Sequence, residues 1–271
     1  MYIGRRQCDY SGSIYAGMKV NVAEAKQNSY NWKITMSETR TLYYVHDPMC
    51  SWCWAFVPTW EQIQRELPND IEVVYLLGGL APDSDLPMPE QMKLTIAGYW
   101  QTIQDRVPGT QFNYDFWTKC QPRRSTYPSC RAVLAAKAQA RDSDEAKALE
   151  KAMIKAIQEG YYLNAKNPSD FDTLIAFDTL IAFAEEIGLD VERFEIALNS
   201  ESTIEKLNEE MHMARSIGAQ GFPCLILKSN LILKSNKFAE AEETKSQALK
   251  KPQWQNVPYD YNDASVTLRH L

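Results

Sequence analysis

The chain has 271 residues, of which 45% are hydrophobic and 24% are charged, and its formal net charge is −6. These fractions are ordinary for a globular protein that can bury a real core. An acidic balance without a basic patch argues against nucleic-acid binding, and no apolar run approaches the roughly 20 residues that cross a bilayer. We therefore predict neither a nucleic-acid partner nor a membrane partner.

The first 35 residues are polar and weakly periodic, and we predict that residues 1–35 form a flexible N-terminal extension. They lack the continuous apolar segment of a secretory signal, so we expect no export by that route. The six cysteines are too few for a disulfide scaffold in a chain of this length. Both observations favour the cytoplasm.

A strand, a helix and a second strand are predicted next. Residues 41–46 are rich in the β-branched and aromatic side chains that fit a buried strand, and Asp47-Pro48 ends the run. Apolar residues then recur at helical spacing over 56–67, where Pro58 is a site for a kink. A second apolar run over 71–80 ends at a glycine pair. Together these segments predict a βαβ unit.

The sequence Cys50-Ser51-Trp52-Cys53 lies between the first strand and the helix. We predict Cys50 at the helix N-terminus, where unpaired backbone N–H groups and the helix dipole favour a thiolate over a thiol. Cys53 lies three positions on, close enough to attack a mixed disulfide formed at Cys50. The pattern predicts a redox centre in which Cys50 attacks and Cys53 resolves, with no bound cofactor and no metal.

Two other interpretations of this pair remain open, a zinc site and a pair of inert buried thiols. A structural zinc site needs four ligands and normally a second close pair. The other cysteines offer no such pair, because Cys120 and Cys130 are ten positions apart and Cys8 and Cys224 stand alone.

Residues 90 to about 218 show helical patterns with short breaks. The predicted helices span 90–106, 130–141, 144–163, 170–187 and 202–217. The segment after them, 221–227, is predicted to be a strand headed by Pro223, because proline fits the first position of a strand. An extended piece over 257–261 and a closing segment over 263–271 complete the chain.

Two hexapeptides occur twice in tandem, residues 172–177 again at 178–183 and residues 225–230 again at 231–236. In a helix, six extra residues turn the following face by about 240°, which disturbs packing unless the helix is interrupted. In a strand, the second copy could return as a hairpin. We attach no function to either repeat.

Three strings of the sequence resemble a known family. They are Asp47-Pro48-Met49-Cys50-Ser51-Trp52-Cys53-Trp54, Ser129-Cys130-Arg131-Ala132-Val133 and Gly221-Phe222-Pro223. The chain is similar to the DsbA family of thioredoxin-fold proteins, and the first two strings resemble its FrnE-like branch, whose members are described as predicted protein-disulfide isomerases. The resemblance implies an α/β fold of the thioredoxin type with a large inserted all-helical domain.

The expected domains follow from this resemblance and the helical patterns together. A thioredoxin-like domain is predicted in two parts, 36–89 and 201–271. The inserted helical domain is predicted at 90–200 between them, and the extension at 1–35 precedes both.

The resemblance also implies roles at the site. Cys50 would be the exposed nucleophile and Cys53 the buried partner, while Ser51-Trp52 would tune the reduction potential. Pro223 would be a cis-proline that faces the two thiols. We predict that substrate binds at four residues: Ser51, Trp52, Phe222 and Pro223.

Further residues near the motif allow two interpretations each. His46 and Asp47 could assist proton transfer to Cys53, yet a histidine at a strand end is as often structural. Cys224 follows Pro223 and would either bring a third sulfur near the centre or act as a small buried apolar residue.

The predicted function is a thiol-disulfide oxidoreductase or protein disulfide isomerase in the cytoplasm. Its partners would be protein or peptide thiols and disulfides, with glutathione as a further candidate. One alternative is a glutathione-dependent isomerase or transferase of the kappa-class type. Another is a non-catalytic chaperone that binds peptides on the apolar surface around the motif.

Overall fold

The computed structural model describes residues 40–170, 172–229 and 253–271. These residues belong to one compact unit, 38–271. The predicted extension over 1–35 and the second copy of the later hexapeptide lie outside the described residues. The strands and helices are β1 (Arg40–His46), α1 (Ser51–Glu66), β2 (Ile71–Leu77), α2 (Glu90–Arg106), α3 (Phe116–Lys119), α4 (Tyr127–Lys137), α5 (Ser143–Leu163), α6 (Thr173–Glu186), α7 (Val191–Leu198), α8 (Glu201–Ser216), β3 (Cys224–Ser229), β4 (Gln253–Asn256) and α9 (Ala264–Leu268).

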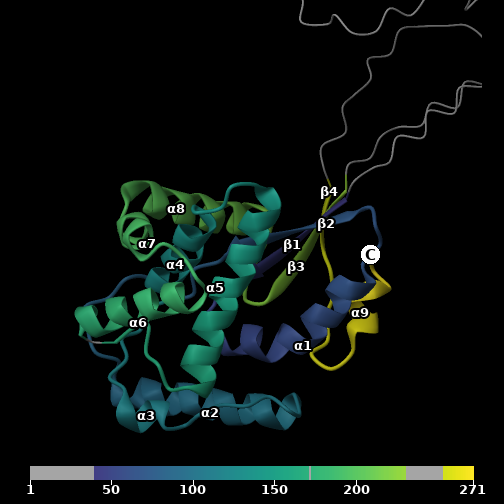
Figure 1. Cartoon of the computed structure of the whole chain (residues 1–271). Coiled ribbons are helices and arrows are strands. Elements are labelled where there is room, and N and C mark those ends of the chain that lie inside the picture. The colour runs from purple at the N-terminus through teal and green to yellow at the C-terminus, as the bar shows by residue number, and fades with distance from the viewer. Residues whose placement is uncertain (1–39, 171, 230–252) are drawn as a thin grey trace, which may run out of the picture. The chain divides into compact units, whose positions relative to one another are not determined.

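The strands form one sheet in the order β2-β1-β3-β4 (Figure 1). Strands β1 and β2 are parallel, which confirms the predicted βαβ unit. Strand β3 runs antiparallel to β1, and β4 runs antiparallel to β3. The second partner of β3 is therefore β4, a segment that the sequence analysis did not predict; it predicted an extended piece only over 257–261.

The two faces of the sheet bury alternate residues of β1, as the period of two in a strand requires. Leu42 and Tyr44 pack in the cluster that contains Trp60 of α1 and Ala264 of α9. Val45 points to the other face, in a cluster with residues of α8. Helix α1 is thus held beneath β1, and its N-terminus lies at the end of that strand (Figure 1).

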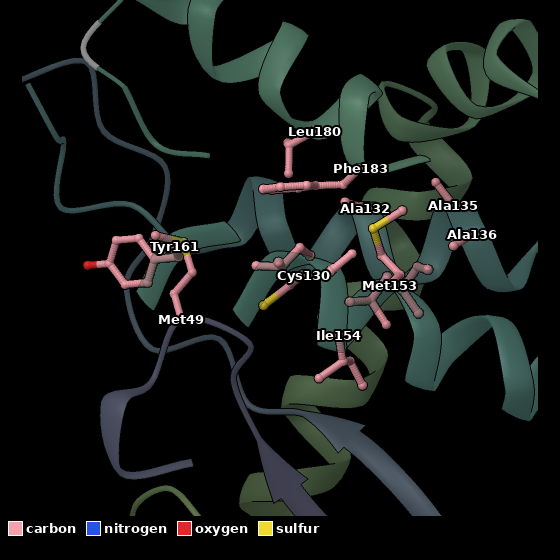
Figure 2. Close-up of a cluster of buried hydrophobic side chains, with 14 of the residues drawn as sticks. Met49, Cys130, Ala132, Ala135, Ala136, Met153, Ile154, Tyr161, Leu180 and Phe183 are labelled. Carbon is pink, nitrogen blue, oxygen red and sulfur yellow. The ribbon is translucent and has the colours of Figure 1, made fainter. Parts of the chain in front are cut away.

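Helices α2 to α7 are inserted between β2 and α8 and share a buried core, to which Leu207 and Met211 of α8 also contribute. Met153 of α5, Cys130 of α4 and Phe183 of α6 meet in this core (Figure 2). Met49, from the loop before α1, also belongs to it and lies near Tyr161 in the same view. The predicted α/β class with a large helical insertion is confirmed, and the loop that carries Cys50 is packed against the insertion.

Helix α2 has the predicted bounds, and the ends of α5, α6 and α8 lie within three residues of the predicted ends. The predicted helix 130–141 is wrong at its C-terminal end, because α4 ends at Lys137 and Asp142 then caps α5 by accepting from Glu145 N. The short helices α3 and α7 were not predicted, since four to eight residues show too little periodicity. No helix among the described residues is long and apolar enough to cross a membrane.

Candidate active site

The predicted position of Cys50 at a helix N-terminus is confirmed. Cys50 is the N-cap residue of α1, with φ −82° and ψ 115°. Its backbone N–H donates to the Asp47 carbonyl at 3.0 Å, and its own carbonyl accepts from Trp54 N at 3.0 Å. The turn over 47–50 therefore delivers the Cys50 side chain to the start of the helix, where free N–H groups and the dipole favour negative charge.

Both cysteines of the pair are buried free thiols. Cys53 has no exposed surface and Cys50 has 6%, so the expectation of an exposed Cys50 is wrong. Cys50 is buried because the loop before β3 lies against it, where the Cys50 thiol donates to the Phe222 carbonyl at 3.6 Å. Access to Cys50 is instead through a cavity that its side chain helps to line.

The Phe222-Pro223 peptide bond is cis, as predicted. The Phe222 ring lies so close to Gly78, just after β2, that a Cβ atom on Gly78 would overlap it. Pro223 is buried, and its carbonyl accepts from the Tyr259 hydroxyl at 3.0 Å. These contacts hold the segment before β3 against Cys50.

Burial raises the pKa of the Cys53 thiol well above its ordinary value, and a hydrogen bond with Cys50 adds to this effect. Burial also raises the pKa of the Tyr44 hydroxyl on β1 well above its ordinary value, and the nearby Cys53 adds to this effect. His46 is 1% exposed, and burial lowers its pKa to about 3, with a further contribution from the charge of Lys137. His46 is therefore neutral at ordinary pH, and its ring stacks on Tyr44 at 5.0 Å between centroids.

Asp47 is a fully buried carboxylate with four neighbours that donate to it. Met49 N donates to Oδ1 at 2.8 Å, while Leu80 N and Thr126 Oγ1 donate to Oδ2, each at 2.7 Å. The Cys130 thiol lies 3.5 Å from Oδ2. Burial raises the pKa of Asp47, and these hydrogen bonds oppose the rise. Asp47 thus holds the loop before Cys50, and its role in proton transfer stays a prediction.

A cavity of about 380 Å³ opens beside Cys50. Three of the four predicted substrate-binding residues, Ser51, Trp52 and Phe222, line it, and Pro223 does not. The insertion supplies residues that the sequence analysis missed, among them Arg123, Arg124, Ser125 and Tyr161. The available signal was the pair of adjacent arginines just before the first residues of α4, in a chain that is acidic as a whole.

The other described cysteines, Cys120, Cys130 and Cys224, are also free thiols. The Cys120 thiol donates to the Ala165 carbonyl at 3.1 Å, and Cys224 lies 3.9 Å from the Asn256 side chain. No three His, Cys, Asp or Glu side chains of the described residues gather closely enough to hold a metal ion. A zinc site would need ligands from elsewhere, such as Cys8, which lies outside the described residues.

A thioredoxin family model matches residues 43–245. The chain belongs to this thioredoxin family. The match begins within β1 and includes the cysteine pair, the helical insertion and β3.

Among curated proteins, the chain is similar to the ClpXP adapter protein SpxH of Halalkalibacterium halodurans, with 24% identity over 189 residues. The alignment covers 68% of this chain and 57% of that protein, so the chain spans little more than half the length of this relative. Among solved structures, a candidate protein disulfide isomerase from Nitrosomonas europaea superposes with a TM-score of 0.61 at 21% identity, covering 86% of this chain and 95% of that one.

The cytosolic disulfide reductase DsbM from Pseudomonas aeruginosa, solved also with GSH, has a TM-score of 0.54 at 21% identity, covering 79% of this chain and 88% of that one. These likenesses confirm the DsbA-type thioredoxin fold with its helical insertion. In a thioredoxin family member, two free thiols one helical turn apart can exchange with a disulfide brought into the adjoining cavity.

Proposed function

We propose that the chain is a thiol-disulfide oxidoreductase in which Cys50 is the nucleophile and Cys53 the resolving cysteine. The observation that carries this proposal is the different surroundings of the two thiols. Cys50 lies at the N-terminus of α1 on the wall of a cavity, whereas Cys53 is fully buried one turn behind it. A substrate sulfur can therefore approach Cys50, and only Cys50 can approach Cys53.

The exchange takes place in two displacements. The Cys50 thiolate bonds to one sulfur of a substrate disulfide, and the other sulfur leaves as a thiolate that takes up the proton lost by Cys50. Cys53 then loses its proton and bonds to the Cys50 sulfur, which releases the second substrate thiol. Two electrons pass from the protein to the substrate, and the reverse sequence oxidises a dithiol. The reduction potentials of the two pairs set the direction.

Ser51, Trp52, Phe222 and Pro223 have supporting roles in the same proposal. Ser51 and Trp52 line the cavity, and the Phe222 carbonyl accepts from Cys50. Pro223 restricts the backbone conformation next to the Phe222 carbonyl. The proposed partners are protein or peptide thiols and glutathione in the cytoplasm, and DsbM, a cytosolic reductase solved with GSH, supports this choice.

The test is the redox state of the protein in glutathione buffers, measured by trapping free thiols and mass spectrometry. We expect one reversible two-electron transition confined to Cys50 and Cys53. The Cys53→Ser variant should accumulate a mixed disulfide at Cys50, and Cys50→Ser should accumulate none. The matched control Cys120→Ser should behave like the wild type. A transition that survives Cys50→Ser would overturn the proposal.

The SpxH relative favours a second candidate, an adapter that binds a protease without using the thiols. Such a role predicts that purified ClpXP binds the full chain and its Cys50→Ser, Cys53→Ser double variant equally well. The redox role predicts that the double variant loses every exchange reaction. The two measurements therefore separate the candidates.

A further inference from the structure

The cavity beside Cys50 is formally positive, although the chain carries a net charge of −6. Arg123 and Arg124 line it, and no Asp or Glu is found among the described residues of its wall. Another part of the lining is apolar and aromatic, including Ile96 and Trp100 of α2. A cleft with charge of one sign and low-dielectric walls concentrates ligands of the opposite sign.

Arg124 is available to a ligand. Its side chain is half-buried, and it has no hydrogen bond or ion pair with any residue that the structure describes. The Arg123 side chain, by contrast, already contacts neighbouring residues. Its Nη1 donates to the Ser84 carbonyl at 3.2 Å and lies 3.9 Å from Asp85 Oδ1.

Three residues that line the cavity have a buried polar atom without a partner among the described residues; one is Trp100, through its Nε1, and the other two are the neighbours of Arg124 in the sequence. The atoms of these two neighbours are Nε of Arg123, a residue with 7% exposure, and Oγ of Ser125, which has 2% exposure. Both residues line the cavity. A buried polar atom without a partner is costly, and most native polar atoms avoid that state. The pair therefore indicates that a polar ligand completes this wall.

We propose that the cavity binds the carboxylate of a low-molecular-weight thiol or disulfide, with Arg124 as its ionic partner and Ser125 as a hydrogen-bond donor, while the ligand sulfur reaches Cys50. A carboxylate suits this wall because the guanidinium fork pairs with two oxygens. A small ligand suits it because about 380 Å³ lies near the lower end of the roughly 300–1,000 Å³ range of small-molecule pockets. This inference rests on the redox function proposed above.

The chemistry is the exchange already described, with the substrate written as a symmetrical disulfide whose two halves each bear a carboxylate. Cys50 bonds to one sulfur and the other half leaves as a thiolate, which takes up one proton. Cys53 then closes the protein disulfide, and the second half leaves as a thiol. The thiol pair supplies both electrons and both protons. The carboxylate at Arg124 is unchanged and only orients the sulfur.

The test compares two small disulfides of similar length, the anionic dithiodipropionate and the neutral bis(hydroxyethyl) disulfide. The reduced full chain is mixed with each one, and the rate of loss of the Cys50 thiol is followed by rapid trapping and mass spectrometry. Each rate is divided by the rate at which the same disulfide reacts with free mercaptoethanol. This division corrects for the intrinsic reactivity of the disulfide. The readout is the ratio of the anionic to the neutral rate.

We expect Arg124→Gln to lower this ratio about tenfold, as the loss of one charge-assisted contact predicts. Arg124→Lys should retain part of the preference for the anionic disulfide. Arg215→Gln, the same change at an exposed arginine of α8 outside the cavity, should leave the ratio unchanged. An equal ratio in the wild type and Arg124→Gln, both folded by circular dichroism, would overturn the inference.

A binding measurement separates failure of this inference from failure of the redox proposal. Methylthiopropionate carries the same carboxylate and no reactive sulfur, and saturation-transfer NMR detects its weak binding. Saturable binding that Arg124→Gln abolishes supports the carboxylate site even if no disulfide reacts with Cys50. Alternatively, both disulfides exchange with Cys50, the ratio of their rates is unchanged by Arg124→Gln, and methylthiopropionate does not bind. That outcome would support the redox function and reject the carboxylate site.

Discussion

The Thr126 hydroxyl donates to Asp47 Oδ2 at 2.7 Å, and this hydrogen bond joins the loop before Cys50 to the N-cap residue of α4 in the helical insertion. Leu80 N, just after β2, donates to the same oxygen. One buried carboxylate therefore fixes three segments that are far apart in the sequence. Because Cys50 lies only three residues after Asp47, the position of the Cys50 thiol depends on this carboxylate.

Replacing Asp47 with Asn should destabilise the protein by roughly 2–3 kcal/mol, because the amide group presents N–H donors to neighbours that are themselves donors. Urea denaturation followed by circular dichroism measures the change. Asp178→Asn, the same substitution at an exposed position in α6, should change stability by less than about 0.5 kcal/mol. Equal stabilities of the two variants would show that the Asp47 contacts contribute little.

The first tandem hexapeptide provides a comparison of identical residues in different surroundings. Helix α6 begins at Thr173, just after its N-cap Asp172, and runs without interruption through the rest of both copies. Equivalent leucines differ sharply in exposure: Leu174 is 72% exposed and Leu180 is 2% exposed. Leu180 and Phe183 of the second copy lie in the helical core (Figure 2). The rotation of about 240° per six residues directs the two copies to different faces.

Leu180→Ala should therefore cost about 2–5 kcal/mol of stability, as buried leucines do. Leu174→Ala should change it by less than about 0.5 kcal/mol. The two variants have the same composition, so the difference between their urea midpoints reports position alone. Similar midpoints would mean that the first copy also contributes to the core.

The sequence predicted those parts of the site that are adjacent in the chain. The cysteine pair, the preceding strand and the following helix are local, so spacing and composition located Cys50 correctly. Arg124 and Asp47 were not linked by any local pattern, because 77 positions separate them and only folding of α4 against the loop brings their segments together. Burial of Cys50 was missed for the same reason, since Phe222 covers it from a distant loop.

Two glycines inside helices should respond to alanine in opposite directions. Alanine favours an exposed helix interior over glycine by roughly 0.5–1 kcal/mol. At Gly98 of α2 a Cβ would meet no atom within 4 Å, so Gly98→Ala should be stabilising. At Gly160 of α5 a Cβ would overlap the ring of the fully buried Phe183, so Gly160→Ala should destabilise despite the better propensity. Thermal unfolding of both variants tests the signs, and stabilisation by Gly160→Ala would show that the ring can move aside.

Glu210 of α8 should make stability depend on pH. Its Oε2 accepts from Leu77 N at 2.8 Å, and burial raises the pKa of its carboxyl group from 4.5 to about 7. A carboxyl whose pKa is higher in the folded than in the unfolded state binds its proton more tightly when folded. The stability that it contributes is therefore complete below pH 4.5 and is lost as the pH rises towards 7.

Glu210→Gln keeps an acceptor for Leu77 N and removes the titration. Relative to this variant, the wild type should lose roughly 2–3 kcal/mol between pH 4.5 and pH 8, from about 1.36 kcal/mol per pKa unit. Urea unfolding of both proteins at several pH values measures the difference between their stabilities. The contributions of His46 and other titrating groups are the same in both proteins and cancel in this difference. Glu209→Gln, at an exposed neighbouring position, is the matched control and should follow the wild type. A constant difference between wild type and Glu210→Gln across this range would show that Glu210 does not titrate there, because solvent reaches its carboxyl group.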